Sequence, residues 1–382
     1  MKTLPGRIFC PAVLWTAIIL WSACVASTAA EAPGFKRITG PCRLSFPADH
    51  GPHPRFRTEW WYYTGNLSTS KGRRFGFQLT FFRSGLRPPG ERKNWPAPAS
   101  AWRSDQVYLA HAAVSDIKGE RHRQAEQMAR PVLSLAGAEQ RGAGWTIHLN
   151  DWRAVIAPQG HHLEADTEAF ALHLDLKPQK PVVLHGQAGY SRKGTTAERA
   201  SCYYSFTRLG TTGVLTVDGI DHEVRGTAWM DHEFSSAPLE PGIAGWDWFG
   251  LQLSDRTEVM LYLLRRSDGS LHPASSATFV AAAGKVRHLT LKALRVQPLA
   301  HWSSPHSGGR YPTRWRINLV PLGLILEVDA SLADQEMRTP RSTGVDYWEG
   351  SVRVKGTRDG QPVSGVGYME LTGYAKPFDA PM

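Results

Sequence analysis

Cysteine is scarce in this sequence, with four among 382 residues. Cys10 and Cys24 lie near the N-terminus, whereas Cys42 and Cys202 stand alone further along the chain. Because no two cysteines are spaced as Cys-x-x-Cys, a cysteine metal site or redox site is disfavoured. Cys42 and Cys202 fit either a disulfide or two separate buried thiols, because sequence spacing does not give their distance in space.

Several catalytic motifs are also missing. The sequence contains no Gly-x-Ser-x-Gly elbow, no His-Glu-x-x-His, no phosphate-binding loop and no dinucleotide fingerprint. His161-His162 and Asp49-His50 are isolated pairs without metal-ligand spacing, and we expect both pairs in loops. A serine hydrolase or a metalloenzyme is therefore disfavoured, and we expect neither a cofactor nor a metal.

Blocks of positive charge are missing too, although the formal net charge is +10. Lysines and arginines are scattered and mixed with acids, without a nucleic-acid-binding motif. The charge therefore predicts a solvated surface, with attraction to an anionic membrane surface as the alternative, and no nucleic-acid partner. Nothing in the sequence sets the oligomeric state.

The longest apolar run lies at the N-terminus and is too short for a confident membrane span. Lys2 and Arg7 precede an apolar stretch over 12–26, and small residues follow up to Ala30. This layout predicts a signal peptide over residues 1–30 and export to the periplasm or the medium. Lipidation at Cys24 is the alternative form of processing.

Amphipathic helical patterns are hard to find, and short strand-like runs recur instead. Val107–Val114, Phe170–Leu176 and Trp315–Val320 are examples, and Gly, Pro and Asp separate such runs. The pattern predicts an all-β protein of antiparallel sheets closed into barrels or sandwiches. Segments 84–104 and 118–143 are rich in Pro, Arg, Gly or Ala, and we expect loops or a short helix there.

The stretch Arg57–Leu67 has the strongest strand signal, because it places four aromatic residues in a row after an acid. Side chains in a strand alternate between two faces, here Glu59, Trp61 and Tyr63 on one and Trp60, Tyr62 and Thr64 on the other. Either face would bury an aromatic wall close to a carboxylate, which then needs a partner or a task. The alternative is a surface Glu59 paired with Arg57.

Parts of the chain appear twice, in the same order. Glu59-Trp60 corresponds to Asp247-Trp248, and each is followed by an apolar run that ends in arginine, Arg83 or Arg265. Met230-Asp231 corresponds to Met369-Glu370, each after an Asp-Gly turn signal, and Tyr203-Tyr204 corresponds to Tyr347-Trp348. The repeat predicts two domains of one architecture, over 31–240 and 241–382.

A second group of polar residues follows Trp229. Asp231, His232 and Glu233 are consecutive on a predicted strand, and the second copy has Leu371 in place of His232. This difference suggests that any chemistry lies in the first half, where Glu59, Trp61, Asp231 and His232 would converge on one cavity. The alternative is that Asp231 and His232 fix the end of the strand by hydrogen bonds.

Five stretches of the sequence resemble one family, namely Phe46–Leu67, His111–Asp116, Ser201–Arg208, Gly226–Ser235 and Gly245–Leu253. Together they resemble the AttH-like proteins, often labelled predicted secreted hydrolases and related to carotenoid 1,2-hydratase (hydroxyneurosporene synthase). The resemblance implies two tandem lipocalin-like antiparallel β-barrels. It also implies a cofactor-free addition of water to the double bond of an apolar molecule.

Residues and resemblance together suggest an exported protein that binds an apolar ligand, isoprenoid or lipid, with hydratase or hydrolase activity as a further expectation. A non-catalytic lipid carrier and a scaffold of an export or membrane system are the alternatives. The candidate catalytic residues are Glu59, Asp231 and His232. The candidate ligand-binding residues are Trp60, Trp61, Tyr63, Arg83, Tyr203, Trp229, Asp247 and Trp248.

Overall fold

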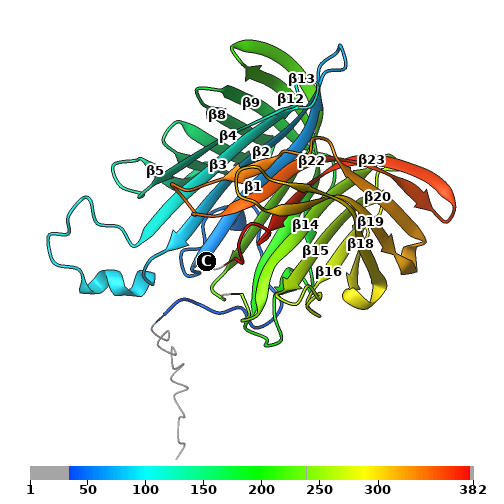
Figure 1. Ribbon diagram of the computed structural model, residues 1–382. Helices are drawn as coiled ribbons and strands as arrows, with labels where there is room; N and C mark the ends of the chain where they lie inside the picture. The colour runs from blue at the N-terminus through cyan, green and yellow to red at the C-terminus, as the bar shows by residue number, and fades with distance from the viewer. Residues whose placement is uncertain (1–33, 238, 379–382) are drawn as a thin grey trace, which may run out of the picture. The chain divides into compact units, whose positions relative to one another are not determined.

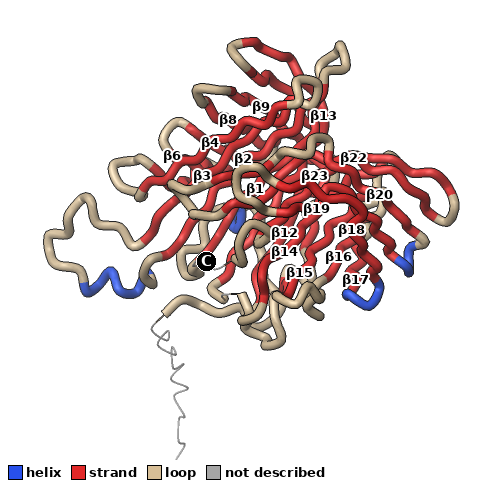
Figure 2. Tube along the Cα trace, in the orientation of Figure 1, coloured by secondary structure: helices blue, strands red, loops and turns tan. Residues whose placement is uncertain are grey.

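Antiparallel strands make up most of the protein in the computed structural model, which describes residues 34–237 and 239–378 (Figures 1 and 2). The predicted signal peptide and Cys24 lie outside the described residues. Residues 34–382 belong to one compact unit. Among the described residues, no helix has the length and apolar character needed to cross a membrane.

The first sheet has 13 strands. They are β1 (Thr58–Ser68), β2 (Arg74–Gly85), β3 (Gln106–Asp116), β4 (Arg121–Ala129), β5 (Ala136–Arg141), β6 (Gly144–Leu149), β7 (Trp152–Ala157), β8 (Gly160–Asp166), β9 (Phe170–Pro178), β10 (Val183–Leu184), β11 (Tyr190–Arg192), β12 (Ala200–Val217) and β13 (Ile220–Ser235). Their order across the sheet is β4-β3-β2-β1-β13-β12-β9-β8-β7-β6-β5, with β10 and β11 paired to β12. Edge strand β4 contacts β6, so the sheet curls almost into a closed barrel.

The second sheet has ten strands. They are β14 (Ile243–Leu253), β15 (Glu258–Arg266), β16 (Ser276–Val280), β17 (Val286–Thr290), β18 (Leu294–Ser303), β19 (Arg310–Leu319), β20 (Leu324–Ala330), β21 (Glu336–Arg338), β22 (Asp346–Arg358) and β23 (Gln361–Thr372). The order is β17-β16-β15-β14-β23-β22-β20-β19-β18, with β21 paired to β22. This sheet also curls towards a barrel (Figure 1). The fold is therefore all-β with two tandem barrel-like halves, as predicted.

The described helices are short 3-10 helices of three to six residues, drawn in blue in Figure 2. They are η1 (Ala48–His50), η2 (Pro89–Asn94), η3 (Leu291–Ala293) and η4 (Val320–Leu322). The loop prediction for 84–104 is confirmed except for residues 84 and 85, which end β2, and η2 is the other regular element described within it. The loop prediction for 118–143 is wrong, because β4 and β5 lie there. Their sequences are polar and lack the alternation of apolar residues that marks a strand. Hydrogen bonding to the neighbouring strands β3 and β6 nevertheless holds them in extended conformation.

Each half has its own apolar core, and a third cluster lies between the halves. Trp61 and Tyr63 point into the core of the first half, and Phe249 and Leu251 point into the core of the second. The third cluster contains Tyr62, Tyr203, Trp229, Trp248, Tyr262 and Tyr368. Alternation along β1 explains this division: odd-numbered residues fill the first barrel, and even-numbered residues face the second sheet.

The strand registers confirm most of the predicted repeat and correct one part of it. Tyr62 pairs with Asp231 and Trp248 pairs with Glu370, so Met230-Asp231 does correspond to Met369-Glu370. In that register Glu59 corresponds to Gly245, because both lie opposite the matching arginines, Arg83 and Arg265. The predicted match of Glu59-Trp60 with Asp247-Trp248 is therefore wrong by two residues. A slip of two keeps every side chain on its face, which is why the sequence did not reveal it.

A disulfide joins Cys42 to Cys202 on β12, with their Cα atoms 5.9 Å apart. It ties the irregular segment before β1 to the first sheet. Phe56, Phe234 and Ile38 pack around this junction. The segment that carries His50 and His53 is thereby held against the end of the first barrel.

Candidate functional site

A cavity of about 380 Å³ lies between the two sheets. Its first wall consists of two adjacent rows of cross-strand partners. One row runs Asp231, Tyr62, Thr80, His111, and the other runs Tyr203, Glu233, Trp60, Phe82, Leu109. The opposite wall carries the row Tyr262, Trp248, Glu370, Glu349 of the second sheet. Aromatic rings and carboxyl groups therefore share one cavity.

Glu349 and Glu370 lie directly opposite each other on β22 and β23. Burial raises the pKa of Glu349 well above its usual value, and the charge of Glu370 adds to the shift. Burial also raises the pKa of Glu370 to about 7, with Asp231 and Glu233 contributing. Two carboxylates side by side repel each other, so this pair retains at least one proton near neutral pH.

The two acids differ in their access to the cavity. Glu349 is 1% exposed, and its Oε1 accepts a hydrogen bond from Tyr62 Oη at 2.6 Å. Glu370 is partly exposed, and its Oε1 accepts longer bonds of 3.2 Å from Trp246 Nε1 and Thr372 Oγ1. Glu370 Oε2 accepts no hydrogen bond from a described residue. Glu370 is thus the carboxyl group of the pair that can approach a ligand.

Asp231 faces the same cavity from the first sheet, but both of its carboxylate oxygens already accept hydrogen bonds. Its Oδ2 accepts a bond from Tyr203 Oη at 2.6 Å, and its Oδ1 accepts bonds from Trp229 Nε1 at 2.6 Å and from Ser205 Oγ. Burial nevertheless raises the pKa of Asp231 to about 7. Tyr203 Oη in turn accepts a bond from Trp248 Nε1 at 3.0 Å, so this network joins the two sheets.

Lys193 is a cation at the same cavity. Its Nζ lies 2.9 Å from Glu233 Oε1 and 3.7 Å from the centre of the Tyr262 ring. Lys193 therefore neutralises Glu233, whereas Asp231, Glu349 and Glu370 have no described cation within ion-pair distance.

Glu59 lies at the end of the cavity inside a saturated network. Its carboxylate accepts bonds from Arg83 Nε at 2.8 Å, His53 Nδ1 at 2.7 Å, His232 Nε2 at 2.8 Å and the His53 backbone amide. Despite complete burial, Arg83 and these donors hold the pKa of Glu59 well below its usual value. Glu59 is therefore ionised and cannot act as a proton donor near neutral pH.

The pKa values of His53 and His232 shift in opposite directions in this network. Although burial opposes it, the carboxylates of Asp49 and Glu59 on either side of His53 raise its pKa to about 9. Burial lowers the pKa of His232, whose Nδ1 bonds with Tyr204 Oη at 2.9 Å. The positive charges of His53 and Arg83 thus balance the negative charges of Asp49 and Glu59.

His53, Glu59 and His232 are also the described residues best placed to hold a metal ion, with ligand atoms within 4.8 Å of one another. A metal ion would have to displace the proton of His53. It would also bind beside the guanidinium of Arg83, which already occupies Glu59 Oε2. The charge balance disfavours a metal at this cluster.

The structure brings some of the predicted site residues together and separates others. Six of them line the cavity between the sheets: Glu59, Trp60, Arg83, Tyr203, Asp231 and Trp248. Trp61, Tyr63 and His232 point into the first barrel, on the face where the carboxylate of Glu59 also lies, although Glu59 borders the cavity at its end. Trp229 packs between the sheets, and Asp247 forms an ion pair with Arg265 at 3.0 Å. Glu59, Trp61 and His232 do meet in the first half, because His232 Nε2 lies 2.8 Å from Glu59 Oε1 and the His232 ring stacks on Trp61. Asp231 faces the cavity between the sheets instead, so the prediction that all four converge on one cavity is wrong for Asp231.

Sequence reasoning missed the contribution of the second half. Glu349, Tyr262 and Tyr347 line the cavity, yet none was a candidate site residue. One signal was available, since the two-residue turn Asp359-Gly360 sets Glu349 opposite Glu370 by counting back along the hairpin. It also missed His161-His162, which lie on β8 rather than in a loop because β7 and β9 pair on either side.

Residues 37–374 match the family model described as AttH-like. The chain belongs to the AttH-like family. Among curated proteins, no sequence matches it. A crystal structure described as an AttH from Nitrosomonas europaea is 36% identical over 90% of this chain and 99% of that chain, with a TM-score of 0.77. The family resemblance seen in the sequence is confirmed.

Two more distant structures share the fold of this AttH-like protein. Kievitone hydratase from Nectria haematococca is 13% identical, and the match covers 90% of this chain and 99% of that chain with a TM-score of 0.67. CghA in complex with Sch210972 is 15% identical, and the match covers 88% and 95% of the two chains with a TM-score of 0.55. At these identities the likeness establishes the lipocalin-like fold alone.

Proposed function

We propose that this AttH-like protein adds water to a carbon–carbon double bond of an apolar molecule held between the two sheets. The observation that carries the proposal is the Glu349–Glu370 pair, a proton-retaining pair of carboxyl groups in an aromatic cavity. The cavity volume of about 380 Å³ suits a small apolar ligand. The hydratase among the proteins of the same fold agrees with this chemistry.

Glu370 would donate the proton. Its O–H bond breaks as the π electrons of the alkene form a new C–H bond, which leaves the other alkene carbon as a cation. Water adds to that carbon through its oxygen and returns one proton to the Glu370 carboxylate, so the enzyme is restored and no cofactor is consumed. A carboxylic acid with a pKa near the working pH is well matched to both steps.

The aromatic walls would stabilise the intermediate cation. Trp60 and Tyr62 face the cavity from the first sheet, and Trp248 and Tyr262 face it from the second. The faces of aromatic rings attract positive charge, and more strongly where water is excluded. Asp231 would favour the cation further when it is ionised.

A hydrolase mechanism through serine receives less support. Ser342 Oγ lies 2.9 Å from His111 Nε2 at the cavity. Burial lowers the pKa of His111 to about 4, and Tyr347 Oη lies 2.8 Å from its Nδ1. Ser342 donates its proton to Glu126, so His111 donates to Ser342 and does not act as its base. Ser342 therefore lacks the histidine base that a nucleophilic serine requires.

The first experiment identifies the ligand. Native protein is equilibrated with a membrane extract, repurified and extracted, and bound molecules are identified by mass spectrometry. A molecule with a double bond is then incubated with the enzyme in deuterium oxide enriched in ¹⁸O. Hydration predicts one deuterium on carbon and one ¹⁸O in the product.

The variant Glu370→Gln tests the proton donor. Loss of general acid catalysis should lower kcat at least about 100-fold. Glu327→Gln, which changes a half-buried acid on β20 that does not line the cavity, should leave kcat unchanged. Full activity of Glu370→Gln, or a bound ligand with no double bond, would rule out this mechanism.

A non-catalytic carrier is the second candidate, and Arg83 is the observation that favours it. Arg83 borders the cavity, and its guanidinium lies with Glu59 on the barrel face, where the buried Nη1 has no hydrogen-bond partner among the described residues. A polar end of a ligand that reached this group would be oriented by it. A bound fatty acid or phospholipid, with no product formed, would support the carrier.

We also propose that the protein is exported. The Cys42–Cys202 disulfide supports export, because such bonds persist mainly in oxidising compartments. The N-terminal mass of the mature protein tests this proposal. A mass that begins near Ala30 or Glu31 agrees with signal-peptide cleavage, whereas an acylated Cys24 would indicate a lipoprotein.

A further inference from the structure

Two exposed loops meet at one end of the first sheet, beside the cavity. The first loop leads from β2 into β3, and the second leaves β4 towards β5. Because β3 and β4 are antiparallel, with Tyr108 opposite Ala129, the start of β3 and the end of β4 lie together. Figure 1 shows the first loop, with η2, projecting from this end of the sheet.

Large apolar side chains are exposed at this end. Leu86 is 55% exposed, Trp102 63%, Met128 55% and Leu133 62%. Leu86 and Met128 also line the cavity, so the apolar surface continues from the solvent into the site. Exposed apolar groups that cluster in this way mark an interaction surface rather than a random scatter.

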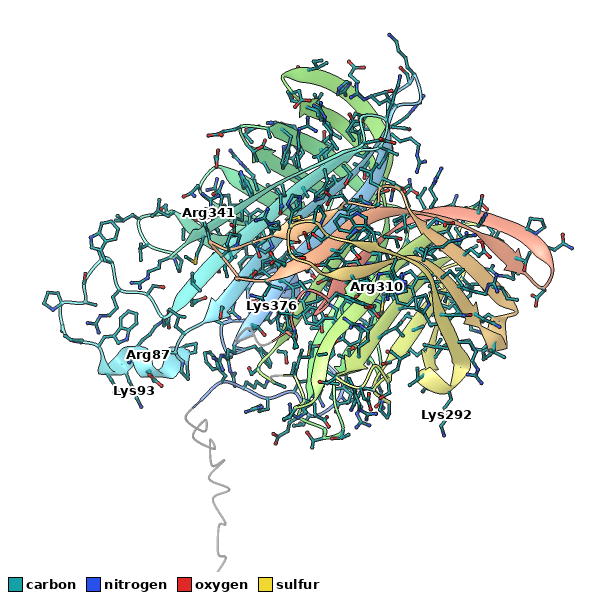
Figure 3. The ribbon with its side chains drawn as sticks, viewed as in Figure 1. Arg87, Lys93, Lys292, Arg310, Arg341 and Lys376 are labelled. Atoms are coloured by element: carbon teal, nitrogen blue, oxygen red, sulfur yellow. A yellow bond between two sulfur atoms is a disulfide. The ribbon has the colours of Figure 1, made fainter. Side chains whose placement is uncertain are left out.

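The same end is rich in positive charge. Arg87, Lys93 and Arg103 lie on the first loop, and Arg341 reaches β4 by its bonds to Glu126. Figure 3 shows Arg87, Lys93 and Arg341 on the same side of the view as this loop, with Lys292 on the other side. Arg87 has only a distant acid, Glu91 at 3.9 Å, and the described residues provide no ion pair for Lys93 or Arg103.

We propose that this docking face (Leu86, Trp102, Met128 and Leu133 with Arg87, Lys93, Arg103 and Arg341) binds the surface of an anionic phospholipid membrane. Tryptophan and leucine would insert at the headgroup level, and the basic side chains would contact lipid phosphates. The cavity mouth then faces the bilayer, and an apolar ligand passes between lipid and cavity without crossing water. This last step rests on the proposed function, whereas membrane binding does not.

The composition of the face favours lipid over a protein partner. A membrane accepts apolar groups scattered along a projecting loop with cations between them, because lipids rearrange around each side chain. A stable protein interface instead needs a large, closely fitting surface, with charge depleted from its centre.

The test is flotation of the whole mature protein with vesicles of phosphatidylcholine alone or mixed with phosphatidylglycerol. Binding should require phosphatidylglycerol and weaken as salt is added. The double variant Lys93→Glu/Trp102→Ala should reduce vesicle binding at least about tenfold, through charge repulsion and loss of the aromatic anchor. Arg103→Glu/Leu133→Ala tests the same face with different residues and should behave alike.

The matched control is Lys292→Glu/Val320→Ala on the second half, where Val320 is 52% exposed. It makes the same charge change and should bind vesicles like the wild type. Absence of vesicle binding by the wild type, or equal loss in control and test variants, overturns the proposal. A change in oligomeric state in the test variants also overturns it, because the face would then join copies of the chain.

Cavity binding is measured separately with N-phenyl-1-naphthylamine, an uncharged fluorescent probe. The docking variants should bind the probe normally, because neither Lys93 nor Trp102 lines the cavity. Probe binding without vesicle binding would overturn the docking face alone. Vesicle binding without probe binding would instead count against the proposed apolar site.

Discussion

Glu59 and Glu370 have opposite ionisation, and their neighbours explain the difference. Glu59 accepts bonds from a guanidinium and two histidines, so its carboxylate is stabilised. Glu370 accepts two long bonds and lies opposite Glu349, so its protonated form is favoured. Burial alone does not make a carboxyl group an acid catalyst, because the donors around it decide which form persists.

The raised pKa of Glu370 predicts a pH-dependent difference between the wild type and Glu370→Gln. The folded protein retains this proton up to about pH 7, whereas the unfolded chain releases it near 4.5. The wild type therefore loses stability as pH rises through that window, and the glutamine variant does not. Melting curves recorded from pH 5 to pH 8 should show the variant gaining stability relative to the wild type as the pH rises. The relative gain in the free energy of unfolding should reach up to about 3 kcal/mol.

Glu327→Gln is the control for this shift. Its partners Arg314 and Arg316 lower the pKa of Glu327 to about 2, so it stays ionised throughout pH 5–8. The difference between that variant and the wild type should remain constant over the range. A constant difference for Glu370→Gln as well would show that Glu370 ionises like an ordinary surface acid.

His232 is predicted to act on stability rather than on turnover. Its ring is buried, stacks on Trp61 at 4.8 Å and donates to Glu59. His232→Ala should lower the free energy of unfolding by about 3 kcal/mol, since it leaves a cavity and removes a bond to a buried carboxylate. Chemical denaturation measures the loss.

His173→Ala provides the comparison, because His173 is exposed and pairs, among the described residues, with Asp166. It should change stability little. If His232→Ala instead kept normal stability and abolished turnover, the catalytic role that its sequence suggests would be restored.

At the scale of elements, the sequence predicts strands and turns well, but it does not predict which face of a strand points into a barrel and which lines the cavity. Asp218-Gly219 and Asp359-Gly360 form hairpin turns as expected, with positive φ at all four residues. Both faces of β1 are aromatic, however, so alternation does not reveal which face fills a barrel and which lines a cavity. Only packing of the second sheet against Trp60 and Tyr62 settles that question.

A β-bulge limits prediction further in the first half. Counting back from Asp359-Gly360 pairs Glu349 with Glu370 correctly, because β22 and β23 keep one register throughout. The same count from Asp218-Gly219 would place His232 opposite Ser205. The structure places Asp231 there, because the register shifts by one between Phe206 and Leu209. A single inserted residue thus decides which polar side chain reaches the cavity.

The disulfide predicts an element-scale effect on the segment before β1. It closes a loop of 160 residues, and long loops lose the most unfolded-state entropy when cross-linked. Replacing both Cys42 and Cys202 by serine should lower stability by about 2–4 kcal/mol.

Reductant supplies the check on that prediction. Dithiothreitol should lower the melting temperature of the wild type but not that of the double serine variant. A thiol assay that finds two free cysteines in the untreated protein would contradict the bond.

At the scale of the whole molecule, the two halves are joined by buried polar contacts as well as by apolar packing. Tyr62 Oη donates to Glu349 at 2.6 Å, and Asn66 Nδ2 donates to the Gly367 carbonyl at 2.9 Å. Lys180 Nζ lies 2.6 Å from Glu258 Oε2. Each contact pairs a residue of the first half with one of the second, so the cavity exists only while both halves are folded.

We therefore predict one unfolding transition for the mature protein, although its length would allow two. Unfolding either half would expose the aromatic cluster between the sheets and leave Glu349 and Glu258 with fewer partners. In scanning calorimetry the measured enthalpy should equal the van't Hoff enthalpy. Lys180→Ala should lower the temperature of that single transition, whereas Lys292→Ala on the exposed η3 should not. Two resolved transitions, with only one of them moved by Lys180→Ala, would mean that the halves fold independently and that the cavity forms by their docking.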